Sequence, residues 1–174
     1  PLDDELNYYA LHDWAIQYTV ITDGCSYGSY PTTGMEWSIE KGIPLMSQSK
    51  DRSFDNTPVP GDMSGKLYSI EHWFEDDISN LKQVLETMGS AIININLYDS
   101  FDNFVGPGIY RPMVGERYDP DMIHMVAVVG YNEEDQTWII RNSYGESWGY
   151  KGLAKIPMDE RRIIIDDKIF YPTM

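Results

Sequence analysis

Two β-patterned runs in the second half of the chain restrict its fold more than any other feature. Residues 122–131 (MIHMVAVVGY) and 137–144 (TWIIRNSY) are rich in β-branched and aromatic residues, which favour strands. The five residues between them, NEEDQ, are typical of a turn. The spacing predicts an antiparallel hairpin in which a residue soon after His124 lies opposite one near Asn142.

The remaining pattern predicts an α+β domain. Helical spacing of apolar residues is present in three segments, which are residues 3–18, 32–42 and 75–89. Strand patterns are present in three more, which are residues 90–98, 152–158 and 168–172. We therefore expect one domain over residues 1–174, with helices and loops in about 1–90 and antiparallel strands in about 91–174.

Capping residues predict where two of these helices begin and end. Thr32 or Thr33 is expected to cap the helix that Gly42 ends. Acidic residues open the helix predicted at 75–89, and Gly89 stops it. The polar, Pro- and Gly-rich stretch 47–66 is expected to form a long surface loop and is a candidate surface for a specific partner.

The composition excludes several classes of function. The net charge of −15 argues against nucleic-acid binding, which needs a basic surface. No apolar run approaches the length that crosses a membrane, and the 42% hydrophobic content suits a packed globular protein. Cys25 is the single cysteine, so no disulfide can form within these 174 residues.

The pairing of His124 with Asn142 is a candidate for acid–base chemistry. A histidine beside an apolar run is more often structural, so His124 alone indicates little. An Asn oxygen that accepts from one ring nitrogen would fix the tautomer and aim the other nitrogen at a nucleophile. Asp119, Asp121 and His124 lack a clear fourth ligand, so no metal site is expected.

Several motifs resemble those of the papain-like cysteine peptidases. HMVAVVGY and WIIRNSYGESWGYKG resemble the family's His and Asn segments. In the same order along the chain, LNYYALHDW, DGCSYGSYP, GMEWSIEKGI, GPGIYRP and the final FYP resemble further family segments. The chain is therefore identified as a member of this family over almost its whole length.

The resemblance implies a two-lobed fold, with a mostly helical lobe and an antiparallel barrel lobe. It implies hydrolysis of peptide bonds without a cofactor, with His124 as general base and acid and Asn142 as its orienter. Tyr144 stands where the family has Trp and would shield Asn142 with Trp148. The residues implied to bind the peptide are Gly28 and Ser29 through their backbone, and Tyr30, Pro31 and Ile123 through their side chains.

Cys25 is expected not to be the nucleophile. It lies 99 residues before His124, whereas a papain-type nucleophile precedes its His by about 130–150 residues. Its context, Asp-Gly-Cys-Ser-Tyr-Gly, instead resembles the family's Gly-Cys-x-Gly-Gly element, whose cysteine is structural. The resemblance therefore places the nucleophile in a segment before Pro1.

Two readings remain open at this point. In the first, a separate N-terminal chain carries the nucleophile, completes the active site and is disulfide-linked to Cys25. In the second, the chain is an inactive relative that serves as a structural or binding subunit of an assembly. The resemblance suggests a lysosomal, vacuolar or secreted location, although the single cysteine and the lack of an N-x-Ser/Thr sequon argue against it.

Overall fold

The computed structural model describes residues 30–45 and 67–173. The chain divides into two compact units, Pro1–Trp73 with Pro172–Met174, and Phe74–Tyr171. Some expectations lie outside the described residues: the helix at 3–18, the loop at 47–66, and the roles of Gly28, Ser29 and Cys25.

The first unit contains the helix α2 (Pro31–Glu40). The helix begins earlier than expected, because Pro31 occupies its first turn and Tyr30, not Thr32 or Thr33, is the N-cap. Proline suits this position, since its fixed φ matches the helix and the N–H it lacks would have no helical partner. The expected end is confirmed: Gly42 follows the last turn with a φ of 75°, which suits glycine.

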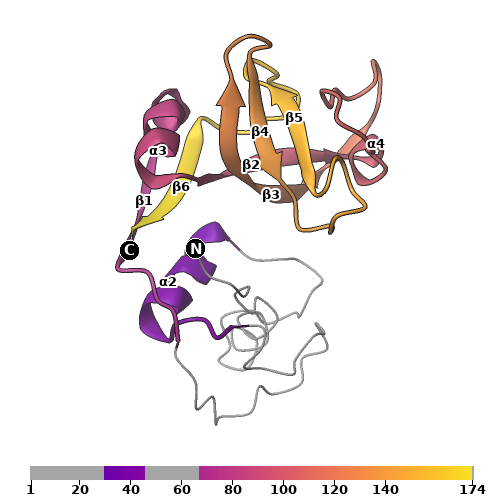
Figure 1. The fold of residues 1–174 in the computed structure, drawn as a ribbon. Helices are drawn as coiled ribbons and strands as arrows, with labels where there is room; N and C mark the ends of the chain where they lie inside the picture. The colour runs from indigo at the N-terminus through magenta and orange to yellow at the C-terminus, as the bar shows by residue number, and fades with distance from the viewer. Residues whose placement is uncertain (1–29, 46–66, 174) are drawn as a thin grey trace, which may run out of the picture. The chain divides into compact units, whose positions relative to one another are not determined.

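The second unit is built on a six-stranded sheet with the order β1-β6-β2-β3-β4-β5 (Figure 1). The strands are β1 (His72–Asp77), β2 (Ala91–Tyr98), β3 (Tyr118–Asn132), β4 (Thr137–Arg141), β5 (Leu153–Pro157) and β6 (Lys168–Thr173). The β2–β3, β2–β6, β3–β4 and β4–β5 pairs are antiparallel. The predicted hairpin at 122–144 and the strands predicted near 90–98, 152–158 and 168–172 are thus confirmed.

The helix predicted at 75–89 is shorter in the structure. Residues 75–77 end β1, the 3₁₀ turn η2 spans Ile78–Asn80, and the helix α3 covers Leu81–Met88. The Asp77 carboxylate caps the turn by accepting from the Ser79 N–H (2.8 Å). The expected stop is confirmed, since Gly89 is left-handed at a φ of 86°.

Two features near α4 (Asp99–Asp102) differ from the expectation. This one-turn helix was not predicted, and it lies at the end of the sheet opposite α3 (Figure 1). β3 begins at Tyr118, four residues before the strand run predicted at 122–131. The reason is a long-range pairing: Tyr118 lies opposite Tyr98 beyond a register shift in β2, and their rings are 5.1 Å apart.

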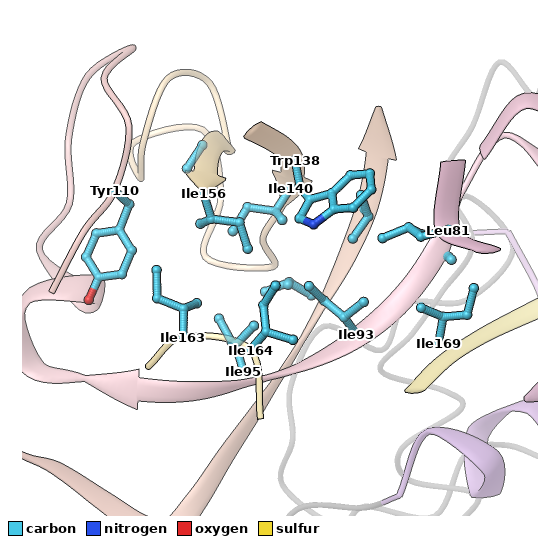
Figure 2. Close-up of a cluster of buried hydrophobic side chains, with 14 of the residues drawn as sticks. Leu81, Ile93, Ile95, Tyr110, Trp138, Ile140, Ile156, Ile163, Ile164 and Ile169 are labelled. Atoms are coloured by element: carbon cyan, nitrogen blue, oxygen red, sulfur yellow. The ribbon is translucent and has the colours of Figure 1, made fainter. Parts of the chain in front are cut away.

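The core of the second unit lies on one face of the curved sheet (Figure 2). Alternate residues of β2, β3 and β4 point to this face, as the strand period of two requires. The 158–167 segment and α3 pack against this face of the sheet. The labelled members of the cluster in Figure 2 are Leu81, Ile93, Ile95, Tyr110, Trp138, Ile140, Ile156, Ile163, Ile164 and Ile169. Among the described residues, no helix is long and apolar enough to cross a membrane.

A matched pair of valines tests this assignment of the core. Val128 is 0% exposed and Val114 is 99% exposed, so the same Val→Ala change removes contacts in one case only. We expect Val128→Ala to lower the free energy of unfolding by about 2 kcal/mol, from lost burial and the cavity left behind. We expect Val114→Ala to change it by less than about 0.5 kcal/mol. Urea unfolding of both variants measures the difference, and equal losses would contradict the assignment.

Candidate active site

The β3–β4 hairpin brings His124 and Asn142 together. His124 lies opposite Ile95 of β2, and Ala127 lies opposite Arg141 of β4. Asn142 follows β4 directly, and its backbone N–H donates to the Gly152 carbonyl (3.0 Å). The imidazole Nε2 lies 2.8 Å from the Asn142 Oδ1. The pairing predicted from the two sequence runs is therefore present in the structure.

The hydrogen bonds of Asn142 determine the tautomer of His124. The backbone N–H of Ser143 also contacts the Asn142 Oδ1 at 2.8 Å. A backbone N–H can only donate, so the atom that it meets is the amide oxygen and not the nitrogen. The imidazole Nε2 must therefore carry the proton that it donates to this oxygen. The second ring nitrogen, Nδ1, is left to act on another group.

The Asn142 side chain is buried, with 6% of its surface exposed, and His124 is half-buried. Within the described residues, the Asn142 Nδ2 has no hydrogen-bond partner. The amide is therefore held through its oxygen, which accepts from two N–H groups at once. Low access to water strengthens both of these hydrogen bonds.

Aromatic side chains surround the pair. The Tyr144 ring lies 5.2 Å from the imidazole, and the Phe101 ring lies 5.8 Å from it at a steep angle. Trp148 packs against Phe101 at 4.8 Å and donates from its Nε1–H to the Phe101 carbonyl (2.6 Å). The structure thus places Tyr144 and Phe101 against the His124 ring, and Trp148 packs behind them, 6.3 Å from the Tyr144 ring.

Tyr144 shields the pair only in part, because 39% of its surface is exposed. Burial, the charge of Asp102 and a hydrogen bond to that carboxylate together raise the pKa of its hydroxyl to about 12. The phenol is therefore neutral over the pH range in which an imidazole titrates. Asp102 lies in α4, next to Phe101.

The contribution of α4 to this site was not predicted from the sequence. Phe101 is fully buried. It lies in the polar stretch DSFDNF, whose sequence shows neither a strand nor a helix period. Nor was a role for Glu116 predicted. Its carboxylate accepts from the Ser100 N–H (2.7 Å), the Ser100 hydroxyl (2.8 Å) and the Met113 N–H (2.8 Å). An isolated aromatic beside an acidic turn was the only signal available.

The predicted peptide-binding residues are only partly placed. Ile123 precedes His124 on β3, points to the opposite face of the sheet and is 57% exposed. Tyr30 and Pro31 belong to the first unit, where Tyr30 is exposed and Pro31 half-buried. Gly28, Ser29 and Cys25 lie outside the described residues. In the part of the chain that the structure describes, no group of three or more His, Cys, Asp or Glu could hold a metal ion.

The loop after Asn142 is tied to the segment after α4 through Gly149. The Gly149 N–H donates to the Phe104 carbonyl, and the Gly106 N–H donates to the Gly149 carbonyl, both at 2.8 Å. Gly149 has a φ of 56°, and a Cβ built on it would lie 2.2 Å from the Leu153 carbonyl oxygen. Only glycine fits this close approach of two backbones.

Comparison with known proteins shows the family. The model of the papain family cysteine proteases matches residues 16–173. Mouse (Mus musculus) cathepsin K is 29% identical over 165 residues, which cover 87% of this chain and 47% of the relative. Human cathepsin O is 25% identical over 173 residues, which cover 91% and 51%. The chain thus spans about half the length of the curated relatives it matches.

A solved structure from a study of the mite allergens Blo t 1 and Der p 1 shares the fold. It superposes with a TM-score of 0.79 at 20% identity, covering 99% of this chain and 57% of that one. At this identity the likeness concerns the fold. The expected α+β, papain-like architecture is confirmed.

Two glycines test the close approach at residue 149. We expect Gly149→Ala to lower the free energy of unfolding by at least about 2 kcal/mol, because the left-handed φ and the contact with the Leu153 carbonyl both oppose a Cβ. Gly108→Ala is the control, since nothing lies within 4 Å of its added Cβ. Thermal unfolding of both variants measures the effect. A Gly149→Ala protein as stable as the Gly108→Ala protein would contradict the geometry.

Proposed function

The chain belongs to the papain family of cysteine proteases, and we propose that it provides the acid–base part of a peptidase active site. In this proposal His124 is the general base and acid, and Asn142 orients it. The observation that carries the proposal is the donation of the Nε2–H to the Asn142 Oδ1 at 2.8 Å. This bond leaves Nδ1 as the ring nitrogen that can take a proton from a thiol.

The chemistry of the proposed site follows from this tautomer. Nδ1 takes the thiol proton, and the resulting imidazolium stabilises the thiolate beside it. The thiolate attacks the carbonyl carbon of the scissile peptide, and His124 then protonates the departing amine. Water then hydrolyses the thioester, and His124 accepts the proton of the attacking water. Through each step the Asn142 oxygen accepts from Nε2, so the ring keeps its orientation.

We propose that the attacking thiol is not that of Cys25. The short separation from His124 and the resemblance of its surroundings to a structural element both support this assignment. The thiol then belongs to a segment outside these 174 residues, either in a longer form of the chain or in a partner chain. Cys25 is the candidate for a disulfide to that partner.

The proposed substrate is an extended peptide or protein segment. Ile123 precedes the base, and its exposed side chain is available to line the pocket for the second residue before the scissile bond. Gly28 and Ser29 are proposed to bind the peptide backbone, and Tyr30 and Pro31 to contact a side chain. Extended peptides commonly bind in this way, with backbone hydrogen bonds supplying affinity and pockets supplying specificity.

The second candidate is a catalytically inactive subunit of an assembly. One observation favours it: Tyr144 stands where the family has Trp, and it leaves more of its own surface exposed than the buried Trp148 does. The intact His124–Asn142 pair favours the peptidase, because an inactive subunit has no need of a buried amide that serves one imidazole.

Chemical labelling of the intact protein tests where the thiol lies. A mass measured without reductant shows whether a second chain is attached at Cys25. The native protein is then treated with a thiol-directed epoxide inhibitor, and peptide mapping locates the modified cysteine. We expect the label on a cysteine other than Cys25. A label on Cys25 would make this assignment wrong, and no label on protein that contains the second cysteine would favour the inactive subunit.

Two histidine variants of the full-length protein test the proposed base. We expect His124→Ala to lower kcat by about 10²- to 10⁴-fold, the usual contribution of general acid–base catalysis. His72→Ala is the control, because His72 is exposed at the start of β1 and we expect unchanged turnover. The measurement is hydrolysis of a fluorogenic peptide by both variants at matched thermal stability. Normal turnover by His124→Ala would remove this residue from the mechanism.

A further inference from the structure

Glu116 joins two segments, the turn at 113–116 and the start of α4, which carries Phe101. Its Oε1 accepts from the Ser100 N–H, and its Oε2 accepts from the Ser100 hydroxyl and the Met113 N–H. The Glu116 N–H donates back to the Met113 carbonyl (3.2 Å). The carboxylate therefore ties the turn at 113–116 to the first residues of α4.

The hydrogen bonds continue from Ser100 to Tyr110 in a single direction. The Ser100 Oγ lies 3.0 Å from the Tyr110 hydroxyl. Because the Ser100 hydroxyl gives its one proton to Glu116, the Tyr110 hydroxyl must be the donor to Ser100. Burial raises the pKa of Tyr110 to about 12, so this phenol keeps its proton. The order of donation is Tyr110 to Ser100 to Glu116.

The buried Tyr110 ring carries this support to the base. It meets the Phe101 ring edge to face at 5.0 Å. Phe101 is fully buried and lies 5.8 Å from the His124 ring and 6.3 Å from the Tyr144 ring. The Phe101 backbone is held by Trp148, whose Nε1–H donates to the Phe101 carbonyl. Phe101 thus has little freedom to move away from the imidazole.

We propose that Glu116 is a positioning residue for His124, acting through Ser100 and Tyr110 to hold Phe101 against the imidazole. The Asn142 hydrogen bond holds the imidazole at Nε2, and the packing of the Phe101 ring limits rotation of the imidazole about its Cβ–Cγ bond. Without this packing, the ring samples orientations in which Nε2 no longer points at the Asn142 oxygen. The inference rests on the proposed role of His124 as the base.

The variant Glu116→Gln tests the inference in the full-length protein. It keeps the size of the side chain, but its NH₂ group must meet at least one N–H that the carboxylate accepted from. Glu134→Gln is the matched control, because Glu134 is exposed in the β3–β4 turn and the change removes the same charge. Tyr110→Phe is a second variant, which removes the hydroxyl link and keeps the ring.

The main readout is the ¹⁵N spectrum of the His124 imidazole, assigned by its loss in His124→Ala. In the wild-type protein we expect the separate signals of a protonated Nε2 and an unprotonated Nδ1. In Glu116→Gln and Tyr110→Phe we expect the two signals to move toward each other, because both tautomers become populated. We also expect kcat to fall about tenfold with KM within twofold, since misorientation of a catalytic group affects the chemical step.

These readouts separate the inference from the proposed function. Spectra of Glu116→Gln and Tyr110→Phe that coincide with that of Glu134→Gln would overturn the inference, whatever the activity. Signals that converge only in these two variants would support it, even in a protein without peptidase activity. If Glu116→Gln does not fold, the spectrum of Tyr110→Phe decides by the same criterion.

Discussion

The hydrogen bonds of one amide oxygen depend on the strand register of the whole second unit. The Asn142 Oδ1 accepts from the Ser143 N–H and from the His124 Nε2–H, both at 2.8 Å. It can do so only while β3 and β4 keep their observed register, in which Ala127 lies opposite Arg141. A slip by one residue would turn His124 to the other face of the sheet, away from the amide. The core therefore stabilises the unit and also fixes the β3–β4 register on which the His124–Asn142 hydrogen bond depends.

The parts of the structure that could be predicted from the sequence depend on contacts close together in the chain. The β3–β4 hairpin follows from two strand patterns and a short polar turn. The stop of α3 follows from Gly89, whose left-handed conformation is cheap for glycine alone. The pairing of His124 with Asn142 follows from the same hairpin. Its register brings a residue soon after His124 opposite one next to Asn142.

The parts that could not be predicted depend on distant partners. The acids at 75–77 suit a helix start by local preference, but pairing of β1 with β6 holds them in a strand, and Lys168 of β6 forms an ion pair with Glu75. Tyr118 joins β3 because Tyr98 lies opposite. The carboxylate of Glu116 contacts Ser100, which lies sixteen residues earlier in a helix of a single turn. No periodic pattern marks such contacts.

The closeness of His124 and Asn142 along the chain has a consequence for folding. Closing the loop between them costs little conformational entropy, because that cost grows with loop length. A hairpin of this length forms in microseconds, well before strands that are far apart in sequence find each other. We therefore expect the imidazole and its amide to meet early on the folding pathway, while α4 and the 113–116 turn arrive later. The order in which the chain folds would then place the imidazole first and restrain its motion afterwards.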